Sequence, residues 1–183
     1  RQWRALPLTS RIEKVKKGIK VFEENRHDIA RDITAATGKP LAASLGETEA
    51  GIEKMKRLCE LAVPALAYEE REGKGVTYQV RRVPKGVIDI MSPWNYPVFT
   101  ALNGVVPALL SGNAVVLRQA EIPAVARWFA KAFGGNQAPL FHMQTSVDTH
   151  NTLSQSDIIK HRVFTGSVSG GRAITKAVGM RVE

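Results

Sequence analysis

A glycine-rich segment, Phe164 to Arg172 (FTGSVSGGR), carries residues that could bind a phosphate. Gly166, Ser167, Gly170 and Gly171 follow a predicted strand and open a predicted helix. The first N–H groups of a helix lack backbone partners and the helix dipole is positive there, so this position favours a phosphate. A capping serine with glycines for close packing explains the same pattern, and both interpretations stay open on the residues alone. The segment is not the GxGxxG fingerprint of ordinary dinucleotide-binding folds.

Glu121 is a second candidate for contact with a nucleotide. It follows a predicted strand and precedes a predicted helix, so its carboxylate could accept hydrogen bonds from the hydroxyl groups of a ribose. An acidic residue at a helix start is also stabilised by the helix dipole. The two interpretations are compatible.

The third candidate is the abrupt end of a buried strand at Ser92, Pro93, Trp94 and Asn95. In open parallel sheets, ligands bind where strands end, so such a break is a common place for chemistry. Taken alone, an asparagine after a tryptophan is a turn residue, and Trp94 is equally compatible with core packing.

A predicted alternation of strands and helices from Gly86 onward positions these segments. The strands are predicted at Val87–Met91, Asn113–Leu117, Phe141–Thr145 and Arg162–Thr165. The intervening helices are predicted at Tyr96–Leu110, from Pro123 to Gly134, and from the glycine-rich segment to about Val178. This order predicts an α/β fold with an open parallel sheet and right-handed crossovers.

The chain before Gly86 is predicted to be mostly helical. Apolar residues at helical spacing predict helices over Leu8–His27, Asp28–Thr37 and Leu45–Val63, with Ser10 as a candidate cap of the first. Residues 69–74 mix charges and predict a polar connector, and alternation over Thr77–Val83 predicts a half-exposed strand.

The composition is that of an ordinary globular protein with a basic surface. The 183 residues are 44% hydrophobic and 23% charged, and the formal net charge is +9. Such a charge attracts anions without choosing among nucleotide, nucleic acid and acidic partner, and the scattered lysines favour a solvated surface over a nucleic-acid site. No apolar run approaches about 20 residues and no signal peptide begins at Arg1. We therefore expect no membrane span and favour a soluble intracellular location, in the cytoplasm or the mitochondrion.

Cysteine and histidine give no sign of a metal site or a disulfide. The single cysteine, Cys59, lies among apolar residues at helical spacing and is expected to be buried. The histidines, His27, His142, His150 and His161, show no metal-ligand spacing with one another or with Cys59.

Four segments in register resemble the aldehyde dehydrogenase superfamily. They are MSPWNYP (Met91–Pro97), PALLSGNAVVLRQAE (Pro107–Glu121), FTGSVSGGR, and an upstream stretch that ends in TGKP (Thr37–Pro40). The resemblance covers almost the whole chain but only the amino-terminal, cofactor-binding part of the family pattern. It implies a Rossmann-like, three-layer α/β domain of aldehyde dehydrogenase type, with amino-terminal helices and one strand of an oligomerisation sheet.

The resemblance also implies roles for individual residues. Asn95 would donate its side-chain amide to the oxyanion at the reacting carbon, while Ser92, Pro93 and Trp94 would line the cofactor cleft. The pyrophosphate of NAD or NADP would bind Gly166, Ser167 and Gly171, and the adenosine ribose would bind Arg118 and Glu121. The family has lysine, proline, serine and glutamate where this chain has Arg118, Gln119, Ala120 and Glu121. An arginine near the ribose favours a 2′-phosphate and Glu121 repels one, so the residues do not choose between NAD and NADP.

By this resemblance, residues 1–75 are amino-terminal helices, 76–85 an association strand and 86–183 an incomplete cofactor domain. No segment matches the general-base glutamate or the cysteine nucleophile, and Cys59 does not correspond to that nucleophile. We therefore expect the cofactor-binding part of an aldehyde dehydrogenase, inactive by itself, that meets an aldehyde only with the missing domain.

One alternative of another class remains at this stage. A degenerate dehydrogenase half could serve as a basic structural subunit of a larger assembly, with RNA as one candidate component. The charge of +9, the altered RQAE segment, and Val147, Asp148 and His150 where the family tends to have glycines all agree with it.

Overall fold

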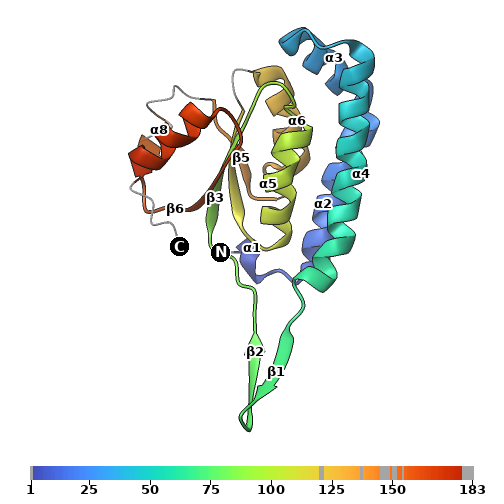
Figure 1. The fold of residues 1–183 in the computed structure, drawn as a ribbon. Helices are drawn as coiled ribbons and strands as arrows, with labels where there is room; N and C mark the ends of the chain where they lie inside the picture. The colour runs from blue at the N-terminus through green and yellow to red at the C-terminus, as the bar shows by residue number, and fades with distance from the viewer. Residues whose placement is uncertain are drawn as a thin grey trace.

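The computed structural model describes residues 2–119, 122–136, 138–144, 149, 152–153 and 155–178. It shows an α/β protein in which a parallel sheet is covered by helices, with further amino-terminal helices outside them (Figure 1). The predicted fold class is confirmed. Among the described residues, no helix combines the length and the apolar character that crossing a membrane requires.

The sheet has four parallel strands in the order β5-β4-β3-β6. They are β3 (Val87–Ser92), β4 (Ala114–Gln119), β5 (Leu140–His142) and β6 (Ile159–Phe164). The central strands β3 and β4 are buried along most of their length, as their short β-branched runs predict.

Helices cover the sheet on both sides. Figure 1 shows α5 (Phe99–Leu110) and α6 (Pro123–Phe133) on one side and α8 (Val168–Val178) on the other. Pro123 opens α6 in its first turn, where proline has no hydrogen bond to lose. The helices α5 and α6 follow β3 and β4 in turn, which makes two successive βαβ units.

The amino-terminal helices pack on the outer side of α5 and α6 (Figure 1). They are α1 (Gln2–Ala5), α2 (Leu8–Glu24), α3 (Arg26–Thr37) and α4 (Leu41–Ala65). The two longest, α2 and α4, bury the apolar residues that their periodicity predicts, while their lysines and, except for the buried Glu47 of α4, their glutamates face solvent.

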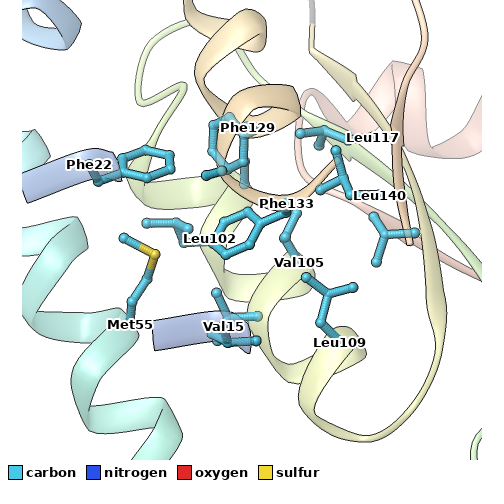
Figure 2. Packing of buried hydrophobic residues seen from close by; sticks show 14 of the residues in the cluster. Val15, Phe22, Met55, Leu102, Val105, Leu109, Leu117, Phe129, Phe133 and Leu140 are labelled. Carbon is cyan, nitrogen blue, oxygen red and sulfur yellow. The ribbon is translucent and has the colours of Figure 1, made fainter. Parts of the chain in front are cut away.

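Aromatic rings join the amino-terminal helices to the α/β domain. The ring of Phe22 meets that of Phe129 edge to face at a centroid distance of 5.4 Å, and lies 6.2 Å from that of Phe133. Figure 2 shows these side chains among residues from the helices and the sheet. The shared core therefore joins the helices of residues 2–66 to the α/β domain.

The carboxyl-terminal end of α5 is held by two side chains from the amino-terminal helices. Trp3 donates its indole N–H to the Leu109 carbonyl at 3.0 Å, and Arg11 donates its Nε–H to the Leu110 carbonyl at 2.9 Å. The last carbonyls of a helix have no partner within the helix, and a cation is favoured there by the dipole. The amino-terminal helices therefore supply hydrogen-bond donors to the last carbonyls of α5 as well as covering the helix.

Residues 69–80 form an antiparallel hairpin, which corrects the predicted polar connector at 69–74. Strand β1 (Glu69–Gly73) pairs with β2 (Val76–Val80), and the two strands form a separate sheet that projects from the rest of the fold (Figure 1). The sequence predicted only one strand in this region. The two-residue turn has positive φ at Lys74 and Gly75, the geometry that suits a tight hairpin. The sequence did not reveal this strand because four of its five residues are charged and neither face is buried, so it has no apolar alternation.

Several predicted boundaries also differ from the structure. The first long helix ends at Glu24, short of His27, and Ser10 does not cap it because the helix already begins after Pro7. Helix α4 runs past both ends of the predicted Leu45–Val63 and includes Pro64 in its last turn. Helix α5 begins at Phe99 instead of Tyr96, because Pro97 precedes it within a turn.

Two glycines in helices give a matched test of this packing. A Cβ added to Gly18 would lie 2.2 Å from Cε1 of Phe133 and 2.9 Å from the backbone oxygen of Ala132, whereas one added to Gly46 would meet nothing within 4 Å. We expect Gly18→Ala to lower the free energy of unfolding by about 1–3 kcal/mol through overpacking. Gly46→Ala should raise it by about 0.5–1 kcal/mol through helix propensity. Urea unfolding followed by circular dichroism measures both, and equal effects would contradict the α2–α6 packing.

Candidate functional site

The carboxyl ends of three neighbouring strands meet at one edge of the sheet. Ser92 of β3 is level with Gln119 of β4, and Met91 is level with Phe164 of β6. The Thr165 N–H donates to the Met91 carbonyl at 3.0 Å, which holds the two strand ends together. The turns that follow β3 and β6 therefore start side by side, about 5 Å apart.

The order of the strands reverses at this edge. From β3 the chain moves outward through β4 to β5, and β6 then lies on the opposite side of β3. A crevice forms where successive crossovers leave a parallel sheet in opposite directions, and ligands bind there in open α/β sheets. The reversal lies between β3 and β6, next to the predicted site residues.

The turn after β3 presents its polar tip to solvent. Asn95 and Tyr96 are exposed, Pro93 is half-buried and Trp94 is 59% exposed. Core packing of Trp94, one of the two sequence interpretations, is therefore wrong in this chain. Ser92 is buried, and its Oγ has no hydrogen-bond partner among the described residues.

The glycine-rich turn after β6 caps its own helix. Ser167 Oγ accepts a hydrogen bond from the Gly170 N–H at 3.1 Å, as expected of an N-cap serine. A Cβ on Gly166 would lie 2.5 Å from the ring of Phe164, and one on Gly170 would lie 2.9 Å from it, so these glycines permit close packing. The capping interpretation is confirmed. The mouth of α8, which is its amino-terminal end at Gly166–Gly171, lies at the same edge of the sheet as the turn of Asn95.

Arg118 lies one residue before the end of β4. Its neighbour Leu117 points into the core beneath α5, so alternation places Arg118 on the face of the sheet that carries α8. Its Nε has no hydrogen-bond partner among the described residues, although it is buried. Glu121, the other predicted ribose contact, lies outside the described residues, as do Val147, Asp148 and His150.

An ion pair that the sequence did not reveal lies on the same face as Arg118. Arg162 of β6 donates its Nε–H to Asp89 of β3 at 2.9 Å, and the side chains are 7% and 0% exposed. Breaking such a buried pair typically costs about 3–5 kcal/mol. The ion pair therefore links β3 and β6, the two strands between which the strand order of the sheet reverses.

Two further buried polar residues contact the turn of Asn95 and were missed in the sequence. Glu47 of α4 accepts hydrogen bonds from the N–H groups of Val98 and Phe99, and Gln119 donates to the Pro97 carbonyl at 2.6 Å. A signal for Glu47 was present, because it falls on the same helical face as buried Gly51 and Met55. A carboxylate on a buried helical face requires a partner from elsewhere in the fold.

The described residues contain no cluster of three or more potential metal ligands. Burial lowers the pKa of His142, and burial together with the charge of Lys85 lowers the pKa of His161, so both favour the neutral form. Cys59 is buried in α4, and burial raises the pKa of its thiol. Cys59 and His161 lie away from the edge where the strands end, whereas His142 is the last residue of β5 and is level with Leu117 of β4.

The groups at this edge suit a ligand that carries phosphate groups. The mouth of α8 offers a position favourable to a phosphate, and Arg118 supplies a cation whose Nε lacks a partner among the described residues. Asn95 supplies an exposed amide on the adjoining turn.

Comparison with known sequences identifies one family. The sequence model described as the aldehyde dehydrogenase family matches residues 1–183. N-succinylglutamate 5-semialdehyde dehydrogenase of Acinetobacter baylyi is 33% identical over 180 residues, which cover 93% of this chain and 36% of the relative. The Burkholderia lata enzyme of the same name is 34% identical and is covered over 38% of its length. The chain thus spans little more than a third of these curated relatives.

Solved structures agree with the sequence comparison. An NADP-dependent glyceraldehyde-3-phosphate dehydrogenase from Bacillus halodurans, complexed with NADP, superimposes with a TM-score of 0.86 at 25% identity. The match covers 96% of this chain and 39% of that one. An NAD-dependent benzaldehyde dehydrogenase from Corynebacterium glutamicum gives 0.83 at 25% identity, over 96% of this chain and 40% of its own.

The environment of Cys59 predicts an unreactive thiol. Its burial and raised pKa keep the thiolate, the reactive form, scarce and inaccessible in the folded protein. We expect Cys59 to react with Ellman's reagent at least about 100-fold more slowly than glutathione at the same pH, and to react fully in urea. Release of thionitrobenzoate measures both rates. Rapid reaction of the folded chain would overturn the assignment of Cys59 to the core.

Proposed function

Because the chain belongs to the aldehyde dehydrogenase family, we propose that it supplies the cofactor cleft and the oxyanion donor of an NAD(P)-dependent aldehyde dehydrogenase. Such an enzyme oxidises an aldehyde to a carboxylic acid. The nucleophile and the general base come from residues outside the present sequence, since its single cysteine is buried in α4. These 183 residues alone are then inactive.

One observation carries this proposal. The register of β3 with β6 brings the turn of Asn95 and the mouth of α8 to the same edge, beside the reversal of strand order. A dinucleotide has a phosphate-rich middle and a reactive nicotinamide end, and this edge offers a group for each. The mouth of α8 binds the pyrophosphate, with Gly166, Ser167 and Gly171 around it.

Asn95 acts on the substrate. Attack of a cysteine thiolate on the aldehyde carbon leaves a negative charge on the former carbonyl oxygen, and the Asn95 amide donates a hydrogen bond to it. Donors of this kind commonly contribute about 3–4 kcal/mol to transition-state stabilisation. When bound, the nicotinamide would supply the acceptor for the hydride that leaves the substrate carbon. Pro93 and Trp94 line the cleft, together with the backbone at Ser92.

The adenosine end is bound by Arg118 and Glu121. A guanidinium near the ribose pairs well with a 2′-phosphate, whereas a carboxylate accepts hydrogen bonds from the free hydroxyls of NAD. Arg118 therefore favours NADP, whereas Glu121 favours NAD. Both NAD-dependent and NADP-dependent proteins occur among the similar structures.

Titration of the chain with NAD⁺ and NADP⁺ by calorimetry tests the proposal. We expect micromolar binding of at least one cofactor. Arg118→Gln should weaken NADP⁺ binding about tenfold and NAD⁺ binding less, because it removes one charge-assisted contact. Glu121→Ala should do the reverse. Arg57→Gln, at an exposed arginine of α4 paired with Glu60, is the matched control and should change neither affinity. Absence of binding of both cofactors at millimolar concentration would refute the proposed cleft.

The β1–β2 hairpin is proposed as an association element. Val76 and Tyr78 are 61% and 50% exposed on one face of β2, and nearly all of the hairpin is open to solvent. An exposed two-stranded ribbon with apolar side chains is marginally stable alone and offers an open edge for pairing. We therefore propose that a second copy of the protein covers this face.

Paired lysine substitutions separate the two faces of the hairpin. Val76→Lys with Tyr78→Lys changes the apolar face, and Thr77→Lys with Gln79→Lys adds the same charge to the opposite face. We expect the first pair to convert an oligomer to a monomer in multi-angle light scattering, and the second to leave the mass unchanged. A monomeric parent chain, or equal effects of both pairs, would contradict this role.

A further inference from the structure

The carboxylate of Glu47 is buried beside the turn that carries Asn95. Glu47 comes from α4, is 5% exposed, and faces the start of α5 on a different part of the chain. Its Oε1 accepts hydrogen bonds from the Val98 N–H at 3.0 Å and the Phe99 N–H at 3.1 Å. These amides belong to the N-cap residue and the first residue of α5, and the first N–H groups of a helix have no partner within it.

Helix α5 has no cap of its own. The residue at its N-cap position is Val98, which has helical backbone angles and forms no side-chain cap. A serine or aspartate there would satisfy the first amides locally. Here α4 supplies the acceptor instead, so the start of α5 depends on a tertiary contact. A negative charge at this end also matches the helix dipole.

Lys39 extends the same network to the other side of the turn. Its Nζ forms an ion pair with Oε2 of Glu47 and lies 3.8 Å from the centroid of the Tyr96 ring. A cation at this distance is attracted to the ring face. Because Tyr96 directly follows Asn95, the pair contacts the turn at Tyr96 and again at Val98 and Phe99.

Gln119 holds the turn from the sheet side. It is the last residue of β4, is buried, and donates its Nε2–H to the Pro97 carbonyl at 2.6 Å. The backbone from Tyr96 to Phe99 is therefore held by side chains from α4, from the loop before it and from β4. The Asn95 side chain has no hydrogen-bond partner among the described residues, so its direction depends on this backbone.

We propose that Glu47 is a positioning residue for Asn95, and that Lys39 and Gln119 complete its support. Glu47 itself touches neither substrate nor cofactor. This inference rests on the proposed role of Asn95 as oxyanion donor. A displacement of about 1 Å at a reacting group commonly lowers the rate about 100-fold. The contacts of Glu47, Lys39 and Gln119 are therefore needed for the oxyanion contact of Asn95 as well as for folding.

Three variants of α4 test the proposal in the chain labelled with ¹⁵N. Glu47→Ala removes the acceptor, Glu47→Gln keeps an Oε1 that accepts both N–H groups, and Glu60→Ala removes an exposed carboxylate from the same helix. We expect Glu47→Ala to speed hydrogen exchange of the Val98 and Phe99 amides about 10- to 100-fold and to shift or broaden the Asn95 side-chain amide signal. Glu47→Gln should largely restore both, and Glu60→Ala should change neither.

Two further measurements separate positioning from general damage. Cofactor affinity should stay within about twofold in Glu47→Ala, because Glu47 does not line the cofactor edge. If Glu47→Ala does not fold, Lys39→Met and Gln119→Leu must each displace the Asn95 signal while distant core signals stay unchanged. An unmoved Asn95 signal in every folded variant would overturn the proposal. None of the signals requires bound cofactor, so a failed cofactor titration would refute the proposed cleft without deciding this point.

Discussion

The parallel register of β3 with its two neighbours is the constraint on which the rest of this structure depends. It makes three strands end at one level, so that turns far apart in the chain begin next to one another. The buried pair of Asp89 with Arg162 holds the β3–β6 junction on one face of the sheet. Any slip of this register would separate the turn of Asn95 from the mouth of α8, and no single groove would receive both.

The two turns at this edge are stabilised in different ways. The turn before α8 is local, since Ser167 caps the helix to which it belongs and Phe164 fills the space beneath the glycines. The turn before α5 is held by α4 and β4. Because Ser167 caps α8 locally, the mouth of α8 stays accessible to an anion. The contacts from α4 and β4 hold the backbone next to the exposed Asn95 in place. The amino-terminal helices thereby support the site as well as the core.

Much of the fold was predictable because buried elements have a strong periodic signal. The strand at Val87–Met91 and the helix opening at Pro123 were found to within a residue at one end or both, since apolar runs and proline rules are local. The β1 strand was missed because a ribbon exposed on both faces carries no apolar alternation. Trp94 remained ambiguous because a large aromatic residue in a turn is compatible with burial or with exposure, and only its surroundings decide.

The sequence by itself determined the family, the α/β class and the residues available for chemistry, because glycine, proline and apolar spacing act through local backbone geometry. Only the tertiary structure decided that the turns of Asn95 and Ser167 share an edge and that Trp94 is exposed. It also revealed Glu47, Lys39 and Gln119 as the support of one turn. The Gln119–Pro97 and Glu47–Val98 hydrogen bonds join residues 22 and 51 positions apart. No local pattern records a hydrogen bond that exists only after helices and sheet have packed.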